Sequence, residues 1–374
     1  MHHFNITEEI KNLKLDNIKE NLFNYSYRTK NLRKFDFDNI TAESPLLASY
    51  SSFKGEVFEN IIYELLLYYA SNEPLITRFV LKGPHQGSVN KFVIKSGMTI
   101  DKSDQIVYKS AYKDITEYDA LFFTKDSVYF VEMSITKKTA SLNKRLNKKH
   151  ALLKVLFPSL TVRALIVLTK GSMGISKFPD YCTMWLTRDF EDNQTLKELV
   201  HKKQNASRVN ANYRKKFVEA KSLVYTKFGY FQTLEWILLK SRGHANLVVD
   251  LNFFKSKKVQ LYFDIFTKLY IGFITIENFK SMMPGFDKEA KDDRIFVTIE
   301  KINRKSYDIV YYIKEKSGKL KRLCITNEEL AVKDKDLEGF TNVEVRFIGK
   351  ILKDEQNLTP KTLLTLQKNI HNWK

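Results

Sequence analysis

The stretch YDALFFTKDSVYFVEMSI, residues 118–135, decides the fold. Two runs rich in aromatic and β-branched residues, 120–124 and 127–135, are separated by Lys125-Asp126, and this pattern predicts an antiparallel hairpin. In such a hairpin, residues whose numbers sum to about 251 face each other, so Asp119 and Glu132 should be neighbours roughly 5 Å apart at Cβ. Charged side chains are seldom buried without a partner, so Glu132 on an apolar strand needs an explanation.

The flanking segments extend this pattern into a domain. Residues 51–70 carry apolar residues at helical spacing, and residues 74–110 are strand-and-turn in character. Residues 141–157 predict a basic helix, and VRALIVLT, residues 162–169, predicts a strand covered on both faces. With a short strand at 182–187 and a helix at 190–203, residues 45–203 are expected to form an α/β domain with a mixed sheet, in the order α-β-β-β-α-β-β-α.

The rest of the chain predicts three further regions. Residues 1–44 are expected to form a charged helical leader, residues 204–290 a mainly helical basic region, and residues 291–374 a β-rich C-terminal domain with a terminal helix. The region after residue 203 is a candidate surface for nucleic acid, a partner protein or a second copy of the chain. No repeat of 20 to 50 residues is evident, so a solenoid is excluded.

Charge and composition indicate a class of partner. The chain has 62 Lys and Arg against 43 Asp and Glu, a formal net charge of +19. A positive field of this size favours polyanions, with nucleic acid first, although a lysine-rich genome would produce the same surplus. The two cysteines form no metal-ligand or disulfide pattern, and no apolar run reaches about 18 residues. We therefore expect a soluble cytoplasmic protein that does not enter membranes.

Three acids stand against apolar surroundings and predict a metal site. They are Glu59 in the first helix, Asp119 before one hairpin strand and Glu132 in the other. Taken singly, Glu59 reads as a solvated helix acid and Asp119 as a strand cap, whereas Glu132 requires a partner. Two carboxylates about 5 Å apart repel unless a proton or a cation lies between them. Mg²⁺ or Mn²⁺ is the simplest such cation, and it would activate water for attack on a phosphodiester.

The pattern GxxFE on a helix, then a hairpin with Asp and VYFVE, then a basic helix and an apolar strand resembles the PD-(D/E)xK nuclease superfamily over roughly residues 50–200. The resemblance implies a restriction-endonuclease-like mixed sheet flanked by helices and a metal-dependent endonuclease acting on DNA or, alternatively, RNA. It implies that Asp119 and Glu132 bind Mg²⁺ or Mn²⁺ and that Glu59 assists. Glu56, a turn earlier, is a poorer match.

Position 134 departs from the family pattern, because Ser134 stands where the catalytic lysine of ExK belongs. Two interpretations remain open. In the first, Lys144 or Lys148 on the next helix replaces the lysine, with Lys137 and Lys138 as weaker candidates. In the second, the protein is a catalytically inactive nuclease-fold protein that binds nucleic acid or serves as a subunit of a larger complex. Candidate phosphate contacts are Lys144, Arg145, Lys148, Lys149, Arg214 and Lys215, each of which has the alternative of an ordinary solvated surface charge.

Overall fold

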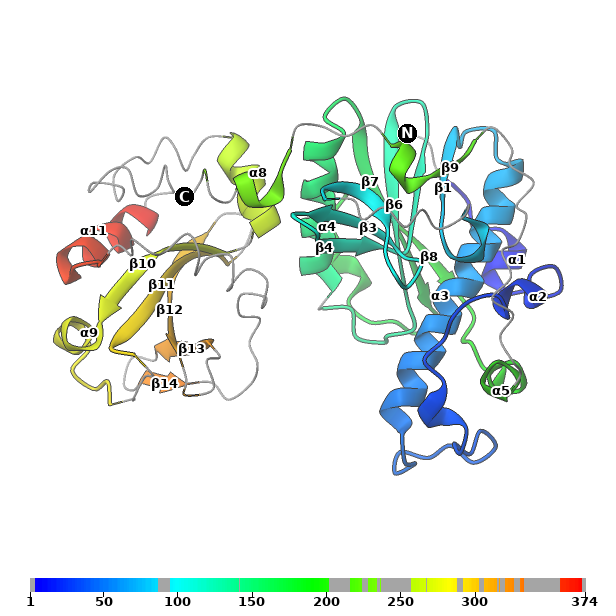
Figure 1. Cartoon of the computed structure of the whole chain (residues 1–374), viewed down its shortest axis with the longest axis horizontal. Helices are drawn as coiled ribbons and strands as arrows, with labels where there is room; N and C mark the ends of the chain where they lie inside the picture. The colour runs from blue at the N-terminus through cyan, green and yellow to red at the C-terminus, as the bar shows by residue number, and fades with distance from the viewer. Residues whose placement is uncertain are drawn as a thin grey trace. The chain divides into compact units, whose positions relative to one another are not determined.

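The computed structural model in Figure 1 divides the chain into two compact units, Met1–Phe228 and Gly229–Lys374. Each unit is described here by itself. The structure describes residues 4–86, 95–140, 142–201, 216–223, 228–233, 236, 257–266, 268–287, 292–302, 306–314, 316, 320–325, 330–332 and 357–371.

The first unit is built on a six-stranded mixed sheet with the strand order β8-β7-β6-β5-β1-β9. Strand β6 pairs antiparallel with β5 and parallel with β7, while β1 pairs antiparallel with β5 and parallel with β9. The strands are β1 (Arg78–Leu81), β5 (Ala120–Phe123), β6 (Ser127–Ser134), β7 (Thr161–Thr169), β8 (Cys182–Thr187) and β9 (Phe217–Glu219). The predicted α/β class and mixed sheet are confirmed.

The deciding hairpin forms as the sequence predicts. Ala120 pairs with Val131 and Phe123 with Val128, so facing residues do sum to 251. The backbone N–H of Thr124 donates to Ser127 O at 2.9 Å, which leaves Lys125-Asp126 as the two-residue turn. Strand β7 is buried from Ala164 to Thr169, as expected of a strand covered on both faces.

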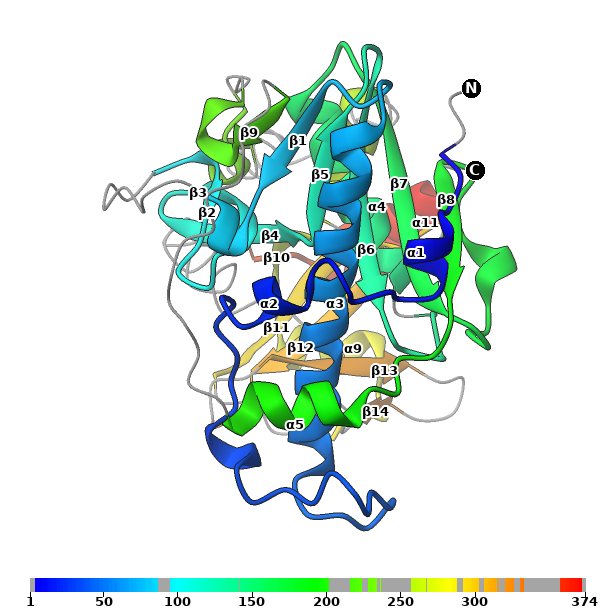
Figure 2. The same ribbon diagram turned by 90° about the vertical axis from the view of Figure 1, so that its right-hand side faces the viewer.

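Helices cover the two faces of this sheet. Helix α3 (Leu47–Asn72) begins four residues before the expected range of 51–70, and Figure 2 shows it running across one face. The buried side chains of α3 pack with Phe79, Phe122 and Val131 in one apolar cluster. Helix α4 (Leu142–Leu156) contacts β6 and β7, and α5 (Asn193–His201) buries Leu196 and Leu199 in the α3 cluster.

The leader belongs to the first unit rather than standing apart. Its short helices α1 (Glu8–Lys11), α2 (Lys19–Leu22) and η1 (Lys30–Leu32) contribute Ile10, Leu22 and Leu32, each fully buried, to the cluster around α3. The Trp185 side chain on β8 donates to the backbone carbonyl of Phe4 at 3.1 Å. Because its apolar residues complete the core, the leader forms no separate domain at residue 44.

Residues 95–118 form a second, three-stranded sheet inserted between β1 and β5. It contains β2 (Gly97–Ile100), β3 (Ile106–Ser110) and β4 (Lys113–Tyr118), all antiparallel. The strand-and-turn character of residues 74–110 indicated strands here, but did not reveal that they leave the main sheet. The insertion brings residues 101–105 and Glu117 toward the end of β5, where the candidate site lies.

The second unit is an antiparallel sheet in the order β10-β11-β12-β13-β14, with helices α8 (Lys257–Phe266), α9 (Ile276–Met282) and α11 (Pro360–His371). Its strands are β10 (Lys268–Thr275), β11 (Arg294–Lys301), β12 (Tyr307–Lys314), β13 (Leu320–Ile325) and β14 (Leu330–Val332). The β-rich tail and its last helix match the expectation, whereas β9 and β10 lie inside the region expected to be mainly helical.

The observed division lies at residue 228. The expected boundaries after residues 203 and 290 lie outside the described residues. Among the residues that the structure describes, no helix is both long and apolar enough to cross a bilayer.

Candidate active site

Asp119 and Glu132 come together at one end of the hairpin. Asp119 directly precedes β5, and one further step in the register from the Ala120–Val131 pair sets it beside Glu132. Its Oδ2 accepts the backbone N–H of Met133 at 2.7 Å, which fixes the carboxylate against the end of β6. Both acids line the same cavity, so the predicted neighbourhood of these two residues is confirmed.

Glu59 approaches this pair from α3. Burial raises the pKa of Glu59 to about 8, and the charge on Asp119 adds to the rise. Burial also raises the pKa of Asp119 to about 6, with the charge of Glu132 as the next cause. Both shifts have the same physical origin, which is burial together with the like charge of a neighbouring carboxyl. The three acids selected from the sequence therefore form one electrostatic cluster.

Glu132 has two cationic partners, both from α4. Lys149 Nζ donates to Oε2 at 2.6 Å, and Arg145 Nη2 lies 2.5 Å from Oε1. Burial would lower the pKa of Lys149, but the charges of Glu132 and Asp119 outweigh it and raise the pKa, so the amine is a cation at neutral pH. Side-chain cations therefore compensate the buried carboxylate, whereas the sequence argument had called for a metal ion.

The position of Lys149 could have been found from the sequence. Leu142, Leu146, Leu153 and Leu156 are buried along one stripe of α4, and Lys149 occupies the same stripe at 4% exposure. A lysine in an apolar helical stripe needs a buried acid as its partner. The burial of Lys149 contradicts its predicted place on a nucleic-acid surface.

The sequence analysis also missed Lys82. This residue follows β1 and is 1% exposed, and extending the β1–β5 register sets it beside Asp119. Burial lowers the pKa of Lys82, opposed by the charges of Asp119 and Glu59. Its Nζ donates to Gln105 Oε1 at 3.2 Å and lies 4.9 Å from the centre of the Tyr63 ring. In the sequence, a lysine directly after the apolar strand RFVL indicates a cation at the end of a buried strand, which needs an acidic partner.

A buried polar network holds the turn that follows Lys82. Glu64 Oε1 accepts from Tyr25 Oη and lies 2.6 Å from His85 Nε2. Gly83 has a φ of +60°, and an added Cβ would lie 2.4 Å from the Tyr25 ring, so only glycine fits both the backbone and the contact. This turn fixes the direction in which the backbone presents Lys82.

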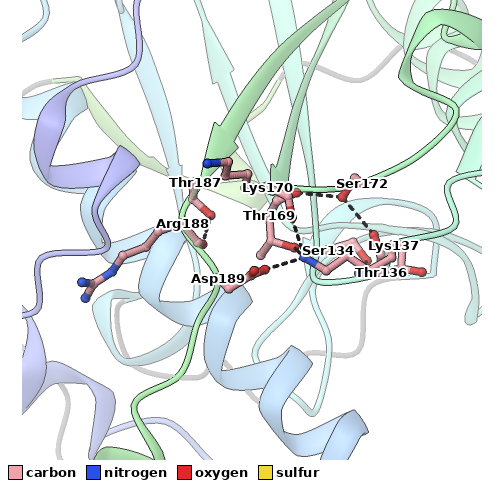
Figure 3. A network of polar contacts seen from close by, with 9 residues as sticks. All are labelled: Ser134, Thr136, Lys137, Thr169, Lys170, Ser172, Thr187, Arg188 and Asp189. Atoms are coloured by element: carbon pink, nitrogen blue, oxygen red, sulfur yellow. Dashed lines mark hydrogen bonds and ion pairs between the residues drawn. The ribbon is translucent and has the colours of Figure 1, made fainter.

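The remaining lysine candidates have different surroundings. Figure 3 shows Lys137 turned toward Asp189, with Nζ 2.5 Å from Asp189 Oδ1 and 3.2 Å from Thr169 Oγ1. Lys137 thereby links the ends of β6 and β7 to the segment after β8, and its amine is engaged away from Glu132. Lys148 is half-buried on α4, and Lys144 lies in α4 with its side chain outside the described part.

The other candidate phosphate contacts also differ in their surroundings. Arg145 is 55% exposed at its side chain and lines the cavity. Arg214 and Lys215 lie outside the described residues. Of the predicted contacts with described side chains, Arg145 is therefore the one placed both on Glu132 and at the cavity.

The cavity in front of these groups has a volume of about 610 Å³. The inserted sheet and α3 add further acids to its wall, and the cations of the lining are fewer. The added acids are Glu56, Asp101, Asp104 and Glu117, and the cations are Arg28, Lys102 and Arg145. An anionic ligand entering here meets a wall rich in carboxylates, so positive charge has to accompany it.

We tested whether the cluster fits a divalent cation. Among the described residues, no three His, Cys, Asp or Glu side chains are arranged to hold a metal ion together. Mg²⁺, however, commonly uses one or two protein carboxylates, with water and substrate phosphate completing its shell. Asp119 and Glu132, two carboxylates that line one cavity, match that smaller set in number and ligand type.

Comparisons with known proteins do not extend this description. No protein-family model and no curated protein matches the chain, and no solved structure matches it.

Proposed function

We propose that the protein is a Mg²⁺- or Mn²⁺-dependent nuclease with a restriction-endonuclease-like core of the PD-(D/E)xK type, hydrolysing phosphodiester bonds of DNA or RNA. The observation that carries the proposal is that Asp119 and Glu132 line one cavity and that a buried lysine, Lys149, contacts Glu132 from inside the protein. The net charge of +19 supports a polyanionic substrate.

Lys149 takes the part of the lysine that Ser134 cannot supply. Its Nζ contacts Glu132 at 2.6 Å, and its raised pKa keeps it charged beside the reacting groups. A fixed cation of this kind stabilises negative charge that develops on an attacked phosphate. The proposal thus retains a replacement lysine from the helix after the hairpin and assigns it to Lys149 instead of Lys144 or Lys148.

The other groups have roles that follow from their charge. Mg²⁺ or Mn²⁺ bound by Asp119 and Glu132 would supply acidity to water and neutralise phosphate charge. Glu59 has a pKa of about 8, so its carboxyl exchanges a proton readily with cavity water near neutral pH. Lys82 offsets part of the charge of Asp119 and Glu59 from the opposite side, and acts as a positioning residue.

A cleavage assay tests this function directly. Purified protein is incubated with supercoiled, linear and single-stranded DNA and with RNA, each with Mg²⁺, Mn²⁺ or a chelator. Asp119→Asn should lower metal-dependent cleavage by about 10²- to 10³-fold. Asp114→Asn serves as the matched control, because Asp114 is an exposed acid that pairs with Lys109. Equal cleavage by the wild type and Asp119→Asn would refute the assignment.

A second candidate is a catalytically inactive nuclease-fold protein that binds nucleic acid. It is favoured by the occupation of both Glu132 oxygens by side-chain cations and by serine at position 134. This candidate predicts salt-sensitive binding without cleavage, and no loss of affinity in Asp119→Asn. The same preparations, tested by filter binding at several salt concentrations, separate the two functions.

A further inference from the structure

The two cations on Glu132 differ sharply in their surroundings. The Lys149 side chain is 5% exposed, whereas that of Arg145 is 55% exposed. They contact different oxygens, Lys149 at Oε2 and Arg145 at Oε1. One oxygen is therefore held by a buried cation, and the other contacts a cation whose side chain is in contact with water.

The position of Arg145 allows it to move without disturbing the fold. More than half of the Arg145 side chain is exposed, so its guanidinium stays in contact with water when it leaves Oε1. The charge of Glu132 then remains compensated by Lys149. Arg145 also lines the cavity, so its guanidinium remains within the space that a ligand would enter. A phosphate is a strong competitor for it, since guanidinium binds phosphate through two parallel hydrogen bonds.

We propose that Arg145 is an exchangeable latch on Glu132. In the free protein it covers Oε1, and a nucleic-acid phosphate entering the cavity draws the guanidinium away and leaves that oxygen available to a divalent cation. Nucleic acid and cation then each strengthen the binding of the other, because coupling between two ligands is reciprocal. This inference rests on the proposed function for its choice of ligands, but its test does not depend on cleavage.

The first experiment uses the metal alone. Binding of Mn²⁺ to the full chain is measured by the loss of the free-ion paramagnetic resonance signal, without nucleic acid. Arg145→Met, which keeps the length of the side chain and removes its charge, should bind Mn²⁺ at least about tenfold more tightly than wild type. Lys154→Met is the matched control, because Lys154 is an exposed cation of the same helix.

Two results of this experiment overturn the latch. In one, Arg145→Met and wild type bind Mn²⁺ equally. In the other, Arg145→Met and Lys154→Met gain affinity to the same extent, so the effect is that of net charge alone. A gain in affinity specific to Arg145→Met supports the latch. Because the Arg145 side chain is more than half exposed, we expect the variant to fold, and circular dichroism checks this.

The second experiment adds a mixed-sequence phosphorothioate DNA duplex that resists cleavage. Wild type should bind Mn²⁺ about tenfold more tightly in its presence, whereas Arg145→Met, already without the latch, should gain much less. An equal gain in both proteins would overturn the transfer of Arg145 to phosphate. Failure of the proposed function is distinguishable, because absence of cleavage of ordinary DNA and RNA would leave the metal-only result for Arg145→Met unchanged.

Discussion

Glu132 in the first unit and Glu300 in the second are buried acids on inner strands of two different sheets. Glu132 stands between Val131 and Met133, and Glu300 follows Ile299. Their exposures are 2% and 6%. Glu300 accepts hydrogen bonds from Tyr312 Oη and Thr298 Oγ1, with the cations of Lys268 and Arg322 at 3.9 and 3.8 Å. All four partners come from strands β10 to β13 of its own sheet.

The comparison teaches that burial of a carboxylate on a strand does not by itself indicate a metal. Both glutamates are compensated by side chains of the protein. They differ in which elements carry their partner side chains, and in whether a carboxylate oxygen can be reached from a cavity. Glu132 is held by a helix, lines a cavity and shares its second oxygen with an exposed arginine. Accessibility, more than burial, makes Glu132 the candidate for chemistry.

The largest expected difference between the two acids is catalytic. Glu132→Gln should lower metal-dependent cleavage by about 10³-fold, because a neutral amide is a poor ligand for Mg²⁺ and a weak partner for Lys149. Glu300→Gln should change cleavage less than about threefold. Initial rates with Mn²⁺ measure both variants. Comparable losses in the two variants would show that the loss reflects general damage to the protein and no special role of Glu132.

The next difference concerns stability. Lys149→Met removes a buried cation at 2.6 Å from Glu132 and should lower the free energy of unfolding of the first unit by about 3 kcal/mol. Lys268→Met breaks a contact of 3.9 Å and should cost only about 1 kcal/mol. Urea unfolding monitored by far-ultraviolet circular dichroism measures both. Adding Glu132→Gln to Lys149→Met should recover part of the loss, and the absence of recovery would argue against the pair.

The pH dependence of stability separates the candidate site from an ordinary buried acid pair. The pKa of Glu59 rises from 4.5 to about 8, so the folded protein holds this proton more tightly than the unfolded chain does. The resulting stabilisation is complete below pH 4.5 and is lost as the pH rises through about 8. In chelator, Glu59→Gln should be more stable than wild type by about 2 kcal/mol near pH 8, with little difference near pH 4.5.

The exposed acid Glu43 provides the control for this measurement, and Glu43→Gln should follow the wild-type curve throughout. Mn²⁺ should reduce the difference between wild type and Glu59→Gln, because a bound cation favours the ionised carboxylate. A difference between these two proteins that does not change with pH would contradict the raised pKa of Glu59.

The smallest expected effect is a rescue. Ser134 lies two residues from Glu132 on the same side of β6. In a Lys149→Met background, Ser134→Lys should restore cleavage by about tenfold, since it returns an amine to the neighbourhood of Glu132. Thr136→Lys, beyond the end of β6, is the control. Equal recovery of cleavage with both lysines would mean that an amine at position 134 is no better placed near Glu132 than one at position 136.

The parts of the structure that the sequence predicted are those that depend on the periodicity of neighbouring residues and on turn residues. The hairpin register followed from Lys125-Asp126 and the apolar runs on each side, and it placed Asp119 beside Glu132. The strand at residues 161–169 followed from its unbroken apolar run. Each of these depends on neighbours in sequence, for which side-chain periodicity is a direct physical signal.

Long-range packing decided what the sequence analysis missed. The apolar stripe of α4 marks Lys149 as inward-facing, but the acid that Lys149 meets there depends on how α4 packs against β6. Lys82 acquires its role because β1 pairs with β5 across some forty residues of chain. The detachment of the inserted sheet likewise depends on contacts between segments that no local pattern specifies.

Strand β9 has a consequence for the way the chain is made. Phe217–Glu219 pair with Phe79–Leu81, so the outer edge of β1 has no partner until some 140 further residues have left the ribosome. An open edge with the sequence FVL is a template for joining another nascent copy. Residues 217–219 therefore cover the edge of β1 only late in synthesis. A chain that stops before Phe217 would leave this edge exposed and would be prone to aggregation.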